Sequence, residues 1–141
     1  MPTDGRLSYD EGVWVGYRGF AARRAPAPAY WFGEGLGYGD WEYGEAAVSR
    51  SLADGLRVTV ELANVSRRDS REVVQVYLKP DSADLPVALL GWATIELGAG
   101  RSGTVEVVCD SRAASFDSRG TVLVARGLGD LRCEEVLESP A

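Results

Sequence analysis

The stretch Leu56-Arg57-Val58-Thr59-Val60-Glu61-Leu62 decides the fold class, because apolar and polar residues alternate along its whole length. Successive side chains of a β-strand point to opposite faces, so a period of two places the leucines and valines on one side. The polar residues then lie on the other side. The sequence therefore predicts a strand that is buried on one face and exposed on the other.

Six further segments after residue 45 predict short strands. The segment 73–78 is β-branched and apolar on nearly both sides, which is typical of a central strand, and Pro80 ends it. Turn residues recur every ten residues or so, as in Gly98-Ala99-Gly100 and Gly127-Leu128-Gly129. The other predicted strands are 46–49, 89–97, 104–109, 121–125 and 131–137.

This pattern indicates an all-β fold, an immunoglobulin-like or fibronectin type III-like sandwich of about seven antiparallel strands. Trp92, in the predicted strand 89–97, is expected to anchor the core. The stretch 111–118 is expected to form no strand.

The first 45 residues have a different composition. They hold ten of the thirteen aromatic residues and nine of the seventeen glycines. Glycine and proline punctuate this region so often that a long helix is excluded, and only the segment 12–17 is expected to form a short strand. We therefore divide the chain into an irregular interdomain remnant or linker, residues 1–45, and a sandwich domain, residues 46–141.

Composition excludes several classes of function. The net charge of −6 argues against a nucleic-acid partner and against an anionic membrane surface, since both need a basic footprint. The 141 residues contain no histidine, which removes Ser-His-Asp and Cys-His nucleophile pairs and the commonest ligand of catalytic zinc. We expect no cofactor and no metal. The start of the chain has no apolar signal segment, so the expected compartment is the cytoplasm.

Cys109 and Cys133 are the only thiols. The alternation Val105, Val107, Cys109 places Cys109 on an inward face, where cysteine behaves as a small hydrophobic residue. A disulfide between the two cysteines stays open at this point.

Two segments of the linker resemble glycoside hydrolase family 3, the β-glucosidases and β-xylosidases. Tyr9-Asp10-Glu11-Gly12-Val13-Trp14-Val15-Gly16-Tyr17-Arg18 is similar to that family's Y-x-E-G-hydrophobic-hydrophobic-V-G-Y-R segment. The stretch from Phe32 to Tyr43 resembles its F-G-x-G-L-S/G-Y-T-x-F/W-E-Y segment, although Gly39-Asp40 replaces the usual threonine pair.

Three later segments extend the resemblance in the same order. Arg71 to Leu78 is similar to the E-V-V-Q-x-Y strand of the family's fibronectin type III-like domain. Pro86 to Trp92 is similar to its P-x-x-x-L-x-G-F/W element, and Leu97 to Gly100 to its L-x-P/A-G turn. The stretch between Phe116 and Gly120 is shorter than the family's tryptophan-containing insert.

The resemblance implies a non-catalytic accessory domain. In such enzymes a barrel carries the nucleophile and a following α/β domain supplies the acid/base, and both lie upstream of the segments matched here. The implied partners are the catalytic domains of a β-glycosidase, in cis or in trans, with weak carbohydrate contact. The candidate interdomain interface comprises Tyr9, Glu11, Trp14, Tyr17, Arg18, Phe32, Tyr38 and Trp41.

Two alternatives to the accessory role are weighed against it. A stand-alone carbohydrate-binding or adhesion module would use the exposed aromatic rings to stack on sugars. An independent hydrolase would need two carboxyls about 5–10 Å apart across a cleft. The pairs Glu134-Glu135 and Asp81 with Asp84 are the nominees, but adjacent strand residues point to opposite faces and loop acids are commonly solvated. Glu11 is interpreted as a structural acid paired with Arg18 or with backbone amides, in preference to a substrate contact.

Overall fold

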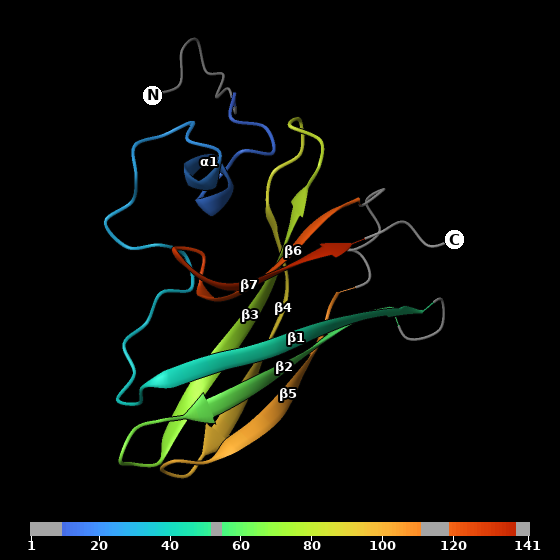
Figure 1. Ribbon diagram of the computed structural model, residues 1–141. Helices are drawn as coiled ribbons and strands as arrows, with labels where there is room; N and C mark the ends of the chain where they lie inside the picture. Colours follow the sequence, from blue (N-terminus) through green and yellow to red (C-terminus); the bar gives the residue numbers. More distant parts are fainter. Residues whose placement is uncertain (1–9, 52–54, 111–118, 138–141) are drawn as a thin grey trace.

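A computed structural model describes residues 10–51, 55–110 and 119–137, which form two antiparallel β-sheets packed face to face. The three-stranded sheet has the order β1-β2-β5, and the four-stranded sheet has the order β4-β3-β6-β7 (Figure 1). The strands are β1 (Trp41–Ser51), β2 (Gly55–Asn64), β3 (Ser70–Pro80), β4 (Ala88–Leu97), β5 (Ser102–Val108), β6 (Gly120–Gly127) and β7 (Asp130–Leu137). The prediction of a seven-stranded antiparallel sandwich is confirmed.

The main core lies between the two sheets and follows the alternation from which the fold was predicted. In β2 the apolar residues are buried and the intervening residues are not, so the strand contributes every second side chain to the core. Cys109 is buried in the same core, as its inward position predicts. The fully buried members from the two sheets include Val58, Val60, Val74, Val76, Val107, Val122 and Val124.

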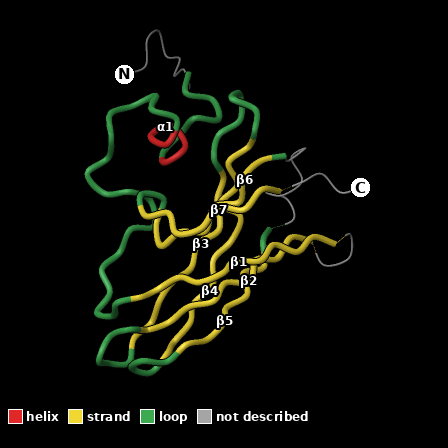
Figure 2. Tube along the Cα trace, in the orientation of Figure 1, coloured by secondary structure: helices red, strands yellow, loops and turns green. Residues whose placement is uncertain are grey.

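The central strand β3 is buried on both faces. Val74, Val76 and Leu78 point into the main core, whereas Tyr77 belongs to a second, smaller cluster on the outer face of the four-stranded sheet. This second cluster forms because residues 10–40, which we call the arm, fold back over that face (Figures 1 and 2). Its buried residues are Tyr77, Leu123 and Ala125, and Tyr17, Val87, Leu89 and Leu128 pack against them.

The predicted strand 12–17 is wrong. Gly12 and Gly16 both adopt a positive φ of 57°, a left-handed conformation that interrupts an extended backbone. The amide of Trp14 donates to the carbonyl oxygen of Glu11 at 3.0 Å, closing a turn, and the short helix α1 (Tyr17–Ala21) follows. The two glycines therefore turn the chain where a short strand was predicted.

The prediction that Trp92 anchors the core is also wrong, since its side chain is 66% exposed. The register between β3 and β4 shifts at Val76 and Tyr77, where Leu90 is the extra residue of a β-bulge. A bulge of one residue reverses which side chains face inward. The residues that pack on the main core beyond the bulge are Ala93, Ile95 and Leu97.

The core tryptophan is Trp41, which is only 7% exposed. It begins β1, which therefore starts before the predicted strand 46–49. Both cysteines are free thiols. Within the described residues, no helix has the length and apolar character needed to cross a membrane. The stretch 111–118 lies outside the described residues.

Candidate functional site

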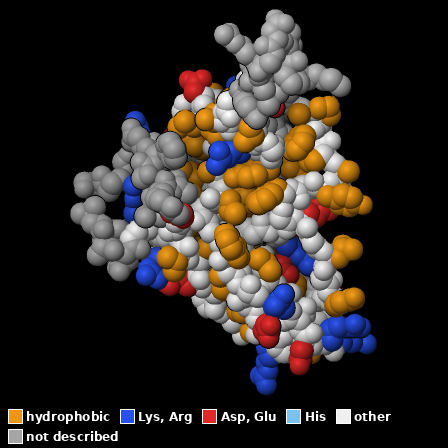
Figure 3. All heavy atoms as spheres, turned by 180° about the vertical axis from the view of Figure 1, so that it is seen from behind, with side chains coloured by type: hydrophobic (Ala, Val, Ile, Leu, Met, Phe, Trp, Pro, Cys, Tyr) orange, Lys and Arg blue, Asp and Glu red, His pale blue; other side chains and the backbone are white. Residues whose placement is uncertain are grey.

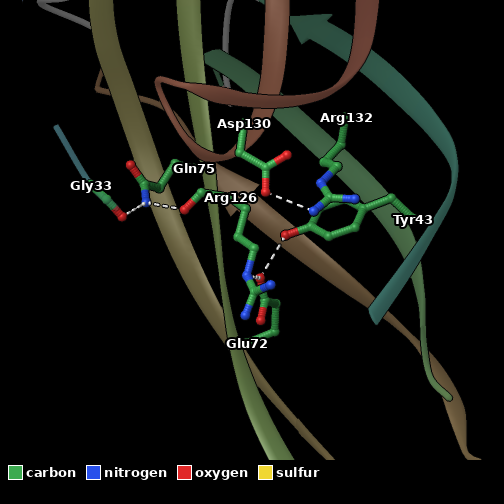
Figure 4. Close-up of polar contacts among 7 residues, drawn as sticks. All are labelled: Gly33, Tyr43, Glu72, Gln75, Arg126, Asp130 and Arg132. Carbon is green, nitrogen blue, oxygen red and sulfur yellow. Dashed lines mark hydrogen bonds and ion pairs between the residues drawn. The ribbon is translucent and has the colours of Figure 1, made fainter. Parts of the chain in front are cut away.

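The arm is fastened to the four-stranded sheet through the side chain of Gln75 on β3. Its Nε2 donates to the carbonyl oxygens of Gly33 in the arm, at 3.0 Å, and of Arg126 on β6, at 2.7 Å (Figure 4). Its Oε1 accepts a hydrogen bond of 2.6 Å from the hydroxyl of Tyr77. Gln75 is buried, so these bonds satisfy a polar group that would otherwise be costly to place there.

Apolar and backbone contacts hold the arm on either side of Gln75. The ring of Tyr17 stacks on Phe32 with centroids 4.6 Å apart and meets Tyr77 edge-on at 6.4 Å. The hydroxyl of Tyr17 accepts a bond of 3.0 Å from the amide of Leu89. The amide of Leu128 donates to the carbonyl oxygen of Phe32 at 2.9 Å. The arm is therefore bound along its length rather than at one point.

The arm carries a large share of the exposed apolar side chains of the described residues. Figure 3 shows the molecule from behind, with hydrophobic side chains gathered in its upper half and along one edge, and charged ones mostly lower down. Exposed apolar groups concentrated in one region mark a contact surface more often than scattered ones do. The exposed large hydrophobic residues of the arm are Val13, Val15, Tyr30, Phe32, Leu36 and Tyr38.

The predicted interface residues are distributed unevenly. Tyr17 and Phe32 meet each other, and Trp14 lies under the guanidinium of Arg24, which is 3.9 Å from its ring centre. Trp41 is in the core, so its ring is not available to a partner. Tyr9 lies outside the described residues.

The remaining predicted contacts are at the surface. Glu11 is exposed, and no ion pair joins it to Arg18 within the described part of the chain. The guanidinium of Arg18 instead lies 5.9 Å from the ring centre of Tyr17. Tyr38 is 88% exposed at the far end of the arm.

A buried polar cluster joins the two sheets beside the arm (Figure 4). The Glu72 side chain is 3% exposed, and its Oε1 accepts from Arg126 Nε at 2.9 Å and from the Tyr43 hydroxyl at 3.0 Å. Arg132 packs over the Tyr43 ring, 5.4 Å from its centre, and pairs with Asp130 at 2.7 Å. This cluster was not predicted from the sequence, although a glutamate and a glutamine inside an otherwise apolar central strand were the available signal.

Burial and charge shift the titration of this cluster. Burial raises the pKa of the Glu72 carboxyl, and the guanidinium of Arg126 opposes that shift. Burial, followed by the negative charge of Glu72, raises the pKa of the Tyr43 hydroxyl. A carboxylate matched by its own arginine and tyrosine is a structural group that links β1, β3 and β6.

None of the four carboxyls in the nominated catalytic pairs is buried. Asp81 and Asp84 are exposed in the β3–β4 loop. Glu134 is exposed and Glu135 half-buried on adjacent positions of β7, where neighbouring side chains point to opposite faces. Glu72 is the one buried carboxylate of the described residues. In the same residues, no group of three or more acidic, cysteine or histidine side chains has a geometry that would hold a metal ion.

A depression of about 450 Å³ lies between the far end of the arm and β3. Leu36 and Tyr38 form its arm side, with three glycines between and beside them. Asp69, Arg71, Glu72 and Arg126 supply its charged groups. This depression could not be predicted from the sequence, because the arm and β3 are brought together only by folding.

The chain is similar in sequence to part of several sugar-cleaving enzymes. It is 37% identical over 116 residues to an exo-α-(1→6)-L-arabinopyranosidase of Bifidobacterium longum, which covers 80% of this chain and 15% of that enzyme. It is 37% identical over 106 residues to a β-glucosidase of Rhizobium radiobacter, covering 72% of this chain and 13% of that enzyme. The chain thus spans about 15% of the length of the curated relatives it matches. No protein-family model matches it.

Solved structures show the same fold within larger enzymes. A β-glucosidase from Streptomyces venezuelae in complex with D-glucose superimposes with a TM-score of 0.84 and 31% identity, covering 96% of this chain and 19% of that one. A GH3 β-glucosidase from Bifidobacterium adolescentis gives a TM-score of 0.81 and 30% identity, covering 96% and 22%. The chain is therefore similar, in sequence and in fold, to a small all-β part of these enzymes.

Proposed function

We propose that this chain is a non-catalytic, fibronectin type III-like accessory domain of a glycoside hydrolase family 3 enzyme. Its role is structural: the sandwich packs beside the catalytic domains and supports them. The observation that carries the proposal is the arm, which is fastened to the sheet by Gln75 and holds apolar side chains toward solvent. Apolar side chains that served only the core of this chain would be buried, whereas these are exposed.

The surface that contacts the catalytic domains is the first part of the arm. We call Val13, Val15, Tyr30 and Phe32 the docking surface, since all four are exposed whereas Tyr17, in the same part of the arm, packs on the sheet. Aromatic side chains are enriched at the centres of protein interfaces, and the two valines extend the apolar area around them. The chain is similar to one segment of enzymes about five times as long, which supports the remaining part of such an enzyme as its partner.

The chemistry of the described residues agrees with a non-catalytic role. A glycosidase needs two carboxyls facing each other across a cleft, one with a raised pKa. The one described carboxyl that is both buried and raised in pKa, Glu72, is held by Arg126 and Tyr43. We expect the purified chain to hydrolyse no aryl β-glucoside, β-xyloside or α-L-arabinopyranoside. Turnover that disappears in a single carboxylate variant would contradict the proposal.

A chimera tests the supporting role directly. In thermostable β-glucosidase B of Acetivibrio thermocellus, which is 31% identical over 119 residues, the matched segment is deleted or exchanged for this chain. We expect the deletion to lower the melting temperature and the activity, and the exchange to restore a substantial part of both. An exchange that behaves like the deletion would argue against the proposal.

The docking surface is tested within the same chimera. The double variant Val13→Ser/Val15→Ser is expected to lower the melting temperature of the chimera but not that of the isolated chain. Val65→Ser is the matched control, because Val65 is about as exposed and lies in the β2–β3 turn beside Asp40, at the opposite end of the arm from Val13 and Val15. Equal effects of the two changes would place the contact elsewhere.

A further inference from the structure

We propose that the depression between the end of the arm and β3 binds a neutral sugar, a mono- or disaccharide in the pyranose form. This site lies beyond the docking surface and does not depend on the accessory role. Its volume of about 450 Å³ falls in the range of roughly 300–1,000 Å³ that small-molecule sites occupy.

Tyr38 provides the apolar part of the site. Its side chain is 88% exposed and lines the depression, so a ring face is open to solvent. The C–H face of a pyranose ring packs against the electron-rich face of an aromatic ring. Gly35 and Gly37 leave the adjoining wall without side chains, so a ring approaches the backbone closely.

Arg126 provides directed hydrogen-bond donors. Its Nε is bonded to the buried Glu72, which fixes the plane of the guanidinium. Its Nη2 lies next to Gly37 of the arm. A Cβ atom added to that glycine would be only 3.0 Å from Nη2. One edge of the guanidinium is thus neutralised by Glu72 while the other lines the depression. Planar groups of this kind bond two neighbouring hydroxyls of a sugar in fixed geometry.

The charges of the depression favour a neutral ligand over an ion. Two acidic side chains, Asp69 and Glu72, are balanced by two basic ones, Arg71 and Arg126. The carboxylates would repel an anion, and the guanidinium groups would repel a cation. A polyol with an apolar face matches both the balanced polar groups and the tyrosine ring.

A titration of the whole chain tests the proposal. Methyl β-D-glucopyranoside is added to ¹⁵N-labelled protein, with sorbitol, which has hydroxyls but no ring face, added to a parallel sample. We expect saturable shifts of the Gly35, Gly37 and Tyr38 amides with the glucoside and not with sorbitol. Absence of saturation, or equal shifts with sorbitol, overturns the proposal.

Variants of exposed tyrosines locate the binding without disturbing the fold. Tyr38→Ala is expected to weaken binding about tenfold, corresponding to one aromatic contact of about 1.4 kcal/mol, whereas Tyr38→Phe retains it. Tyr30→Ala is the matched control, since Tyr30 is 80% exposed in the arm but does not line the depression. A Tyr38→Ala variant that binds like the unmodified chain, or a Tyr30→Ala variant that binds equally weakly, overturns the assignment. Neither result bears on the experiment with the glycosidase chimera, so the sugar site and the accessory role can be contradicted independently.

Discussion

The side-chain amide of Gln75, in the middle of β3, donates a hydrogen bond of 3.0 Å to the carbonyl oxygen of Gly33 in the arm. The two residues are 42 positions apart in the sequence. Because the same nitrogen also bonds Arg126, one buried side chain joins the arm, the central strand and β6. The arm is thereby fastened to the four-stranded sheet by a buried side chain.

Replacing Gln75 by leucine should loosen the arm. The variant leaves the buried hydroxyl of Tyr77 and two carbonyl oxygens without their partner, at a cost of about 1–3 kcal/mol in the free energy of unfolding. Urea denaturation measures this loss, and trypsin cleavage after the exposed Arg23 and Arg24 reports the release of the arm. Val73→Thr, on the same face of β3, serves as the control and should change neither. Unchanged cleavage in the leucine variant would mean that Gln75 does not hold the arm.

Gly33→Ala should be strained for two reasons. Gly33 has a φ of +79°, and a methyl group there would overlap the amide of Gln75. We expect a loss of about 1 kcal/mol or more in the free energy of unfolding. Gly35→Ala is the matched control two residues on, with open space around the added methyl group and no positive φ. Thermal unfolding compares the pair, and equal melting temperatures would contradict the contact.

The contribution of Glu72 to stability should fall as the pH rises. The pKa of this carboxyl in the folded chain lies above its ordinary value of 4.5, so the folded state takes up the proton more readily than the unfolded state. The free energy of unfolding therefore decreases as the pH increases from 4.5 through the raised pKa, and then levels off. Urea denaturation of the unmodified chain and of Glu72→Gln over this range measures the difference.

The sign of that trend is the critical result. If the unmodified chain instead gained stability relative to Glu72→Gln as the pH rose, the pKa of Glu72 would be lowered in the folded state. Arg126→Gln should enlarge the fall and extend it to higher pH, because the guanidinium stabilises the charged form of Glu72.

The two thiols should differ in reactivity. Burial raises the pKa of Cys109 to about 11, so almost no thiolate forms near neutral pH, and thiolate is the reactive species. Cys133 is only half-buried, and its Sγ contacts the carbonyl oxygen of Gly44 at 3.5 Å. With a chromogenic disulfide reagent, Cys133 should react first and Cys109 only on addition of urea. A native-state signal that persists in Cys133→Ser would contradict this order.

The two strand tryptophans should contribute very unequally to stability. Trp92→Thr removes an exposed ring and should change the free energy of unfolding by at most about 0.5 kcal/mol. Trp41→Ala removes a ring from the main core and should cost about 3–5 kcal/mol. Chemical denaturation of both variants decides which ring is the anchor, and a larger loss for Trp92→Thr would reverse the assignment.

The strands were predictable because each one follows a local rule. Alternation in β2 and the two-sided apolar character of β3 reflect the geometry of single strands, and turn residues mark their ends. Trp92 was misassigned because a bulge at Leu90, invisible in the residue types, reverses the inward side of the rest of β4. The segment 12–17 was misassigned because two glycines turn the chain where a strand was expected.

The residues of the arm could be singled out from the sequence, but their roles could not. Among those picked as interface residues, Tyr17 packs on the sheet, Trp41 enters the core and Tyr38 stays exposed. All three are aromatic residues in a glycine-rich region, and nothing local distinguishes them. The roles of Gln75, Glu72 and Arg126 are likewise not visible in the residues taken one by one. Gln75 bonds the carbonyl oxygen of Arg126, and the side chain of Arg126 pairs with Glu72, only in the folded chain.

The sequence by itself determined the all-β class, the seven strands and the lack of histidine chemistry, because periodicity and composition belong to the chain before it folds. The tertiary structure alone decided which rings are buried, which carboxylate is paired, and where the arm meets β3 to form a depression. Those properties arise between residues tens of positions apart. They depend on register, on a one-residue bulge and on the path of the arm, none of which a local pattern encodes.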